Sequence, residues 1–353
     1  MARPTYTTGR IWKRFGLLAV LALAGCAVEQ DTTVIKLGHA LDTDHPVHRA
    51  MEFMAERLVE ESGGTMEIEI YPSQQLGTER EMLELLQIGS LDMTKVSSSV
   101  LENFAPEYQV LSLPFVFRDD AHRFAVLEGP IGDELLAAPE PYRLRGLAFY
   151  DAGSRSFYTV DRPVQTPGDL QGLKIRVQES ATAMDMVRAL GGSPTPIAWG
   201  ELYTALQQGV VDGAENNPPS FYLSRHYEVA KYYVLNEHTA VPDVLIVGTT
   251  LWDRLTPQQQ RWLRNAATAS VEVQKELWRE STEEALAAVQ EAGVEVITAD
   301  KSPFETAVEA MTTTYAADPE LARVLDAIRS TPTPPASGGA APGDTLTSSS
   351  SDA

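Results

Sequence analysis

The sequence contains one cysteine in 353 residues, so no disulfide can form within the chain. Basic residues are scarce, because 28 Lys and Arg stand against 49 Asp and Glu and leave a net charge of −21. Such a chain repels nucleic acids and anionic lipid surfaces, and we expect no nucleic-acid partner. The apolar run Phe15–Leu23 is far shorter than the roughly 20 residues of a transmembrane helix, which disfavours a spanning anchor.

Common enzyme motifs are also missing. The chain has no Gly-x-Ser-x-Gly turn, no His-Glu-x-x-His pair and no phosphate-binding glycine loop, which disfavours a hydrolase or a metal-dependent enzyme on an α/β scaffold. Three of the six histidines, His39, His45 and His48, fall within ten residues. Their spacing matches no trusted metal-ligand pattern, and no nearby cysteine completes a site. We therefore expect no catalytic residue, no metal and no cofactor.

The first residues indicate export. Three basic residues (Arg10, Lys13 and Arg14) precede the apolar run, which leads into Leu23-Ala24-Gly25-Cys26. This pattern predicts a lipoprotein signal peptide over residues 1–25, cleavage before Cys26, and a lipidated linker over residues 26–33. The protein would then be anchored through Cys26 at the periplasmic or extracytoplasmic face of a membrane. The alternative is an ordinary signal peptide that happens to contain a cysteine.

Charge and composition bound the mature chain. Residues 1–25 hold four basic and no acidic residues, so 24 basic residues face 49 acidic ones after cleavage. If the mature protein binds an anion, the attraction must come from a few fixed cations in a cleft. Residues 331–353 are rich in Pro and Ser and predict a disordered tail. About 300 residues remain between these ends, enough for two domains.

Alternating patterns predict an α/β fold with largely parallel sheets. A strand is predicted over Val34–Leu37, followed by a helix that begins at Pro46 and ends at Gly63-Gly64. A second strand over Met66–Tyr71 and a second helix over residues 78–88 follow. From Thr256 to Gly293 the chain holds no glycine and only the proline that follows Thr256, which predicts one helix of about 50 Å that crosses both domains.

An internal repeat supports two related lobes. Leu86–Asp92 (LQIGSLD) matches Leu206–Asp212 (LQQGVVD), and each copy follows the same order of strand, helix, Gly-Gly break, strand and helix. We predict a first lobe over residues 34–153 plus about 242–280, and a second over residues 154–241 plus about 281–330. A ligand cleft between two such lobes is typical of extracytoplasmic binding proteins.

One basic residue stands out on the predicted strand Gly172–Val177. Leu173, Ile175 and Val177 alternate with Lys174 and Arg176, and Arg176 lies nearer the carboxyl end of the strand. Ligands bind beyond that end in open α/β sheets, where a guanidinium can hold a carboxylate through two hydrogen bonds. The pattern alone leaves open whether Arg176 is a ligand contact or a solvated surface arginine.

Six segments together resemble one family. They read, in order, YPSQQLGTEREMLELLQIGSLDM, LPFVFRD, GLKIRV, GSPTPIAWGELYTALQQGVVDGAENN, YEVAKYY and PDVLIV. The chain resembles the substrate-binding subunits of TRAP transporters, in particular the DctP-like group, from about Val34 to Glu305. The resemblance implies a two-lobed periplasmic-binding-protein fold, with a long helix across both lobes, that closes on one organic acid. It also implies membrane subunits of the transporter as partners.

The resemblance implies roles for several residues. Arg176 inherits the carboxylate contact, Arg155 in Gly153-Ser154-Arg155 a second carboxylate or hydroxyl contact, and Asn216 in DGAEN a bond to the same group. Trp199 would form a wall of the pocket. On the first lobe, Glu79 is a candidate acceptor for ligand hydroxyls, although a glutamate at a helix N-terminus explains it equally well.

Two further residues of the first lobe are candidate ligand contacts. Ser97 matches a position that contacts polar ligand groups, and His39, at the end of the first strand, would look into the cleft. The segments KLGHAL, DHPVH and EHTAVPDV resemble those of family members that take uronic or related sugar acids, which implies a hexuronate or a related sugar acid as the ligand. A C4-dicarboxylate or keto acid is the alternative ligand. A sensing lobe that binds ligand without transport is the alternative function.

Overall fold

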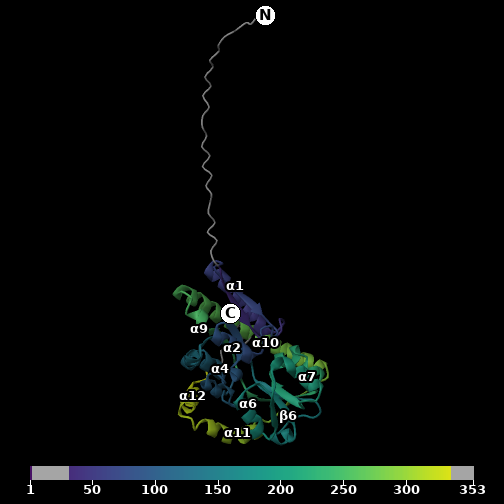
Figure 1. Cartoon of the computed structure of the whole chain (residues 1–353). Helices are drawn as coiled ribbons and strands as arrows, with labels where there is room; N and C mark the ends of the chain where they lie inside the picture. Colours follow the sequence, from purple (N-terminus) through teal and green to yellow (C-terminus); the bar gives the residue numbers. More distant parts are fainter. Residues whose placement is uncertain (2–31, 335–353) are drawn as a thin grey trace, which may run out of the picture. The chain divides into compact units, whose positions relative to one another are not determined.

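The computed structural model describes residues 1 and 32–334 (Figure 1). The predicted signal peptide, the lipidation site Cys26 and most of the predicted tail, residues 335–353, lie outside the described residues. Within residues 32–334, no helix combines the length and the apolar character that a membrane span requires. Residues 32–334 form two mixed sheets, and helices cover both faces of each sheet.

The first sheet has five strands in the order β2-β1-β3-β10-β4. Their bounds are Met66–Tyr71, Thr33–Gly38, Met93–Ser97, Asp243–Gly248 and Leu144–Tyr150. The first three strands in sequence are parallel, and β10 runs antiparallel to both of its neighbours. The intervening helix α1 (Pro46–Ser62) begins at Pro46 and ends before Gly63, as the sequence predicts, and α2 (Glu79–Ile88) matches the helix predicted over residues 78–88.

The second sheet has six strands in the order β11-β9-β5-β8-β6-β7. Their bounds are Glu295–Thr298, Tyr232–Thr239, Arg155–Thr159, Gly213–Asn216, Lys174–Val177 and Ser193–Pro196. Strands β6, β7 and β8 are parallel and are connected by α6 (Ala181–Ala189) and α7 (Leu202–Gln207). The chain passes between the sheets in the short segments β4–β5 and β9–β10.

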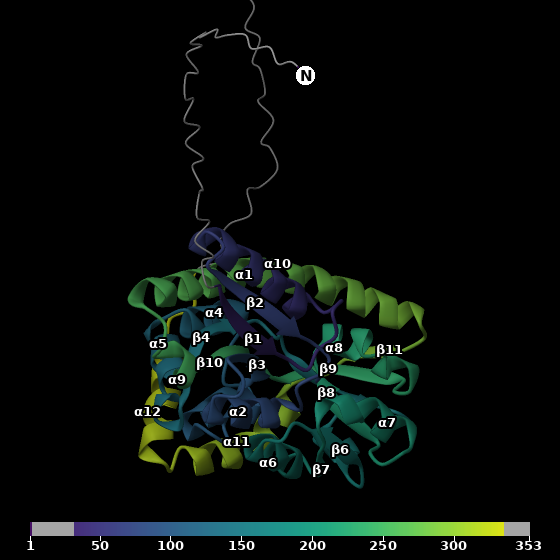
Figure 2. The same cartoon turned by 45° about the horizontal axis from the view of Figure 1, so that its top comes forward.

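A single helix, α10 (Pro257–Glu291), crosses both sheets, as the sequence predicts. Thr256 caps its first turn, and its 35 residues correspond to about 52 Å. It packs along α1 and β4 at the first sheet and along α8 (Pro218–Leu223) at the second (Figure 2). Gln274 of α10 is fully buried and exchanges two 2.8 Å hydrogen bonds with the backbone of Asp151, which fixes the β4–β5 crossing.

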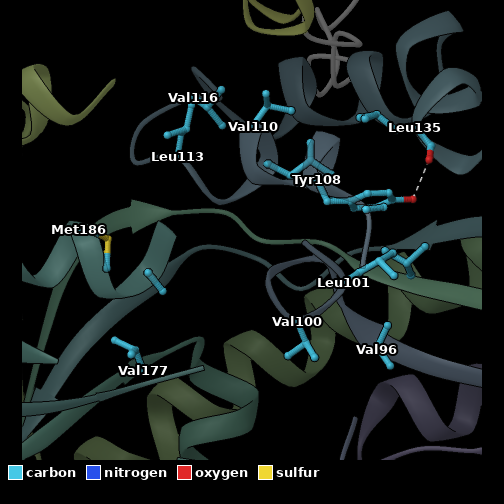
Figure 3. Packing of buried hydrophobic residues seen from close by; sticks show 14 of the residues in the cluster. Val96, Val100, Leu101, Tyr108, Val110, Leu113, Val116, Leu135, Val177 and Met186 are labelled. Carbon is cyan, nitrogen blue, oxygen red and sulfur yellow. Dashed lines mark hydrogen bonds between the residues drawn. The ribbon is translucent and has the colours of Figure 1, made fainter. Parts of the chain in front are cut away.

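Smaller helices complete both lobes. They are α3 (Ser98–Leu101), η1 (Pro106–Ser112), α4 (Asp120–Leu127), α5 (Pro130–Ala137), η2 (Glu140–Tyr142), η3 (Pro167–Leu170), η4 (Trp199–Glu201), η5 (His226–Glu228), α9 (Thr249–Trp252), α11 (Ser302–Tyr315) and α12 (Pro319–Ser330). Around η1, Tyr108 is buried and donates a 2.8 Å hydrogen bond to the carbonyl of Leu135 (Figure 3). The same core extends to Val177 and Met186 at the second sheet.

The last helix departs from the prediction that residues 281–330 stay with the second lobe. Helix α12 packs on η1 and α5, which belong to the segment predicted for the first lobe. Its apolar face, which includes Leu321 and Ile328, joins the core around Tyr108. Residues 331–333 are also held, because Arg118 donates hydrogen bonds to the carbonyl of Thr331 and to Thr333 Oγ1. The packing of apolar side chains, rather than position in the sequence, decides where the C-terminal segment lies.

Candidate functional site

A cavity lies between the two sheets, at the carboxyl ends of their parallel strands. It contains about 660 Å³ of space free of protein atoms, part of it open to solvent. Leu41, Gln74 and Ser97 line it at the ends of β1, β2 and β3, while Gln178 and Asn216 line it at the ends of β6 and β8. This is the edge at which open α/β sheets bind small molecules.

Arg176 reaches this cavity from β6, and its side chain is 2 % exposed. Its Nε donates a 2.8 Å hydrogen bond to the carbonyl of Ile197. Its Nη1 is buried without a hydrogen-bond partner, and no carboxylate among residues 32–334 forms a salt bridge with the guanidinium. Burial lowers the pKa of Arg176 from its ordinary value, since few polar groups replace its water. The group is positioned to attract an anion.

Arg155, in contrast, is already paired. Its Nε and Nη2 contact the Glu215 carboxylate at 2.5 and 2.8 Å, and Nη2 also donates to the Glu215 carbonyl at 2.8 Å. Its Nη1 donates to Asn216 Oδ1 at 2.8 Å. One guanidinium hydrogen of Arg155 therefore remains for the cavity. Burial opposes the charge of Arg155, but Glu215 outweighs it and raises the pKa of the guanidinium.

Glu215 is held from two sides. Burial alone would raise its pKa, but Arg155 and His238 lower the pKa of Glu215 from 4.5 to about 2. His238 Nε2 lies 3.5 Å from Glu215 Oε2, and its ring stacks on Phe157 at 4.4 Å between centroids. His238 is fully buried behind the ion pair and does not line the cavity. His238 therefore helps to hold Glu215 in place and does not contact the cavity itself.

Asn216 and Trp199 line the same cavity as Arg176. Asn216 Oδ1 accepts from Arg155 Nη1 and from the backbone N–H of Asn217 at 2.9 Å, which orients the amide nitrogen of Asn216 away from these donors. The Arg176 guanidinium lies 5.8 Å from the centre of the Trp199 indole, within reach of a cation–π interaction. Trp199 also contacts His226 edge to face at 5.2 Å.

On the first lobe, Lys95 lies between two carboxylates. Its Nζ is 3.3 Å from Glu79 Oε1 and 3.2 Å from Asp243 Oδ2, and all three residues line the cavity. Burial raises the pKa of Glu79, with Lys95 opposing this effect. Burial also opposes the charge of Lys95, but Asp243 and Glu79 outweigh it and raise its pKa. With every group ionised, this cluster carries one net negative charge.

Several polar contacts join the two lobes beside the cavity. Ser97 Oγ donates to Gln178 Oε1 at 3.3 Å, and Asn103 Nδ2 donates to the Glu179 carbonyl at 2.6 Å. Glu102 accepts from Ser180 Oγ at 2.7 Å and from the backbone N–H of Thr182 at 3.0 Å, at the start of α6. The loop that follows Arg176 is thus attached to the first lobe.

The prediction that His39 looks into the cleft is wrong. His39 is fully buried and absent from the cavity wall, because its Nδ1 accepts from the Leu41 N–H at 3.2 Å and its Nε2 lies 2.9 Å from His48 Nδ1. His45 lines the cavity instead, as the N-cap of α1, with its Nε2 3.4 Å from Ser220 Oγ. Burial lowers the pKa of His45 to about 3, so it is neutral near pH 7.

Sequence reasoning missed Lys95, Asp243, Gln74 and Gln178. Lys95 interrupts the buried strand β3, and a charged residue in an otherwise apolar and hydroxyl-bearing strand was the available signal. Asp243 opens β10, which reaches the first sheet only through a long-range return of the chain. Among residues 32–334, no group of three or more metal-binding side chains could hold an ion.

Comparisons with known proteins point to one family. A model of the DctP family, "Bacterial extracellular solute-binding protein, family 7", matches residues 37–318. The uncharacterized protein YiiZ of Salmonella typhimurium is 40 % identical over 296 residues, which cover 83 % of this chain and 90 % of the relative.

Solved structures match the same region. A TRAP periplasmic solute-binding protein from Bradyrhizobium sp. BTAi1, in complex with α/β-D-galacturonate, is 45 % identical with a TM-score of 0.83, and the match covers 84 % of this chain and 99 % of that one. A TRAP periplasmic solute-binding protein from Pseudomonas putida F1 with bound D-glucuronate is 36 % identical with a TM-score of 0.81. The match covers 84 % of this chain and 97 % of that one. The two-sheet fold is common to these proteins.

Proposed function

The chain belongs to family 7 of the bacterial extracellular solute-binding proteins, the solute receptors of TRAP transporters, and on this basis we propose that it captures a hexuronate such as galacturonate or glucuronate. Capture breaks no covalent bond. The ligand enters the cavity between the lobes, and the closed form delivers it to the membrane subunits of the transporter. Solute binding rather than catalysis is the proposed activity.

The observation that carries this proposal is the unpaired guanidinium of Arg176. A ligand carboxylate would accept a hydrogen bond from its buried Nη1. It would also give Arg176 the negatively charged partner that Arg155 and Lys95 already have within the protein. A charge-assisted hydrogen bond in a partly dehydrated cavity is stronger than the same bond in water. We assign Asn216 and the remaining N–H of Arg155 to the same carboxylate or the adjacent hydroxyl, and Trp199 to the face of the sugar.

The first-lobe end of the cavity favours hydroxyls over a second carboxylate. Glu79 and Asp243 accept hydrogen bonds, and their cluster with Lys95 has a net charge of −1 when all three are ionised. A C4-dicarboxylate would bring a second negative charge to this end and be repelled, whereas sugar hydroxyls would donate to the carboxylates. Ser97 and Gln178 offer further polar contacts near this end.

A ligand screen tests the proposal. Purified protein is titrated with uronates, aldonates, C4-dicarboxylates and keto acids while its melting temperature is followed, because a ligand that binds only the folded state raises it. Galacturonate or glucuronate should give the largest shift. A shift with succinate or malate and none with uronates would refute the hexuronate assignment.

We also propose that Cys26 carries the lipid anchor, from the sequence Leu23-Ala24-Gly25-Cys26 that follows an apolar run. The anchor would keep the exported protein beside its membrane subunits. Fractionation of cells that express the Cys26→Ser variant tests this proposal. The wild type should sediment with membranes and the variant should not; a wild type that is soluble in the periplasm would contradict it.

A further inference from the structure

A second unpaired donor lies in the same cavity as Arg176 and comes from the opposite lobe. Among residues 32–334, nine buried side-chain atoms lack a hydrogen-bond partner, and two of them belong to cavity-lining residues: Arg176 Nη1 and Gln74 Nε2. A buried donor without a partner is unfavourable, and a ligand that supplies an acceptor would remove this cost. The function proposed above uses Arg176 and leaves Gln74 without a role.

The backbone directs Gln74 toward the second lobe. Gln74 and the preceding Ser73 both have positive φ, 58° and 51°, which is uncommon for residues other than glycine. Backbone hydrogen bonds hold this loop, among them Ser73 N–H to the Leu41 carbonyl at 2.9 Å, Gln74 N–H to the His39 carbonyl at 3.1 Å, and Gly77 N–H to the Gln74 carbonyl at 3.0 Å. These hydrogen bonds hold the backbone of the loop in its uncommon conformation, and strained residues of this kind cluster at functional sites.

Gly200 of the second lobe makes room for the Gln74 amide. A Cβ atom at residue 200 would lie 2.0 Å from Gln74 Oε1 and 3.2 Å from Gln74 Cδ. The φ of Gly200 is not in the left-handed region, so alanine is acceptable to its backbone, and its effect would fall on the Gln74 side chain. Gly200 follows Trp199, which lines the same cavity. The contact therefore links the position of the Gln74 amide to the approach of the two lobes.

We propose that Gln74 is a specificity-determining residue that donates from Nε2 to a hydroxyl or ring oxygen of the bound sugar acid, with Gly200 as the residue that positions it. This inference rests on the proposed function. It adds a donor to the first-lobe lining of the cavity, which also includes the acceptors Glu79 and Asp243, so that the ligand hydroxyls would meet both donors and acceptors there. An acid without hydroxyls or a ring oxygen beyond its carboxylate gains nothing from Gln74.

Calorimetric titration with galacturonate and glucuronate tests the role of Gln74. The Gln74→Ala variant should bind the preferred uronate at least tenfold more weakly than the wild type. The Gln74→Asn variant should also bind the uronate more weakly, because asparagine suits the left-handed backbone but its side chain is one methylene shorter. Gln75→Ala, an exposed glutamine in the same loop, is the matched control and should bind as the wild type does. Melting temperatures without ligand verify that each variant is folded.

A double-mutant cycle tests the role of Gly200. Gly200→Ala should weaken uronate binding about tenfold in the wild type and by less than twofold in the Gln74→Ala background, since the displaced amide is then absent. Unchanged affinity in a folded Gln74→Ala variant would overturn the assignment of Gln74. Equal weakening by Gly200→Ala in both backgrounds would overturn the positioning role. A wild type that binds no uronate would instead refute the proposed function, so the two failures are distinguishable.

Discussion

Arg155 and Glu215 form a buried ion pair at the back of the cavity, with 2.5 Å between Arg155 Nε and Glu215 Oε2. The pair leaves Arg155 neutralised, and Lys95 is neutralised in the same way by its own carboxylates. Arg176 lines the same cavity without such a partner. This difference is the reason that we propose Arg176 as the anchor for a ligand carboxylate, with Arg155 as a secondary contact that also holds Glu215.

Removal of the Arg176 charge should abolish tight binding. Arg176→Met is expected to lose about 2–5 kcal/mol of uronate affinity, the range for truncation of one partner in a buried charge pair. Without ligand, its melting temperature should be equal to or above that of the wild type, because a buried cation with an unpaired N–H is removed. Calorimetry and thermal unfolding measure the two effects. Arg188→Met, at an exposed arginine, is the control and should change neither quantity.

Removal of Glu215 should destabilise the fold. Glu215→Leu leaves Arg155 as an unpaired buried charge, which costs about 3–5 kcal/mol in the free energy of unfolding. The double variant Arg155→Met with Glu215→Leu should recover most of that loss, because neither charge remains. Urea unfolding of the three proteins tests this coupling. Single and double variants of equal stability would show that the two residues do not act as a pair.

Glu102 should make stability depend on pH in the opposite sense to most carboxylates. Burial raises its pKa above 4.5, and its Oε2 has no hydrogen-bond partner. The folded state therefore favours the protonated carboxyl, so its contribution to stability is present below about pH 4.5 and is lost as the pH rises through the raised pKa. Glu102→Gln keeps an acceptor for Ser180 and Thr182 and removes the charge.

The Glu102→Gln variant should accordingly be about 1 kcal/mol more stable than the wild type at pH 8, with the difference smaller at pH 4.5. Thermal unfolding at both pH values measures it. A variant that is less stable than the wild type at pH 8 would mean that the ionised carboxylate stabilises the contact with α6.

The charge of the first-lobe cluster should set the choice between sugar acids and dicarboxylates. Glu79→Gln combined with Asp243→Asn changes the cluster with Lys95 from −1 to +1, so the attraction of a second carboxylate should rise. We expect uronate affinity to fall at least tenfold and succinate affinity to rise relative to it. Competition calorimetry with both ligands gives the ratio. A ratio unchanged from the wild type would show that this cluster does not select the ligand.

Local patterns predicted much of the fold. The N-caps Thr78 and Thr256, the proline at position 46 and the glycine breaks at positions 63 and 89 are signals that act within a few residues, and the helices begin and end there. The alternation of the strand Gly172–Val177 and the resemblance placed Arg176 near the carboxyl end of a strand facing a cleft, and Arg176 does line the cavity at the end of β6. These are properties of strand direction and alternation, which a sequence carries directly.

Contacts between distant segments could not be predicted in this way. Lys95 meets Asp243 only because β10 returns to the first sheet after some 90 residues in the second lobe. The ion pair of Arg155 with Glu215 could not be predicted from local patterns, because the two residues are on different strands of the second sheet. His39 was misplaced because its ring contacts His48, in the first turn of α1, and does not reach the cavity.

The most direct test of the proposed binding mode is the distance between Arg176 Nη1 and the ligand carboxylate in a crystal structure of the complex with galacturonate or glucuronate. The proposal predicts a carboxylate oxygen within about 2.7–3.2 Å of that nitrogen, with the sugar hydroxyls toward Glu79 and Asp243. A carboxylate bound at Lys95, with Arg176 Nη1 still unpaired, would contradict it.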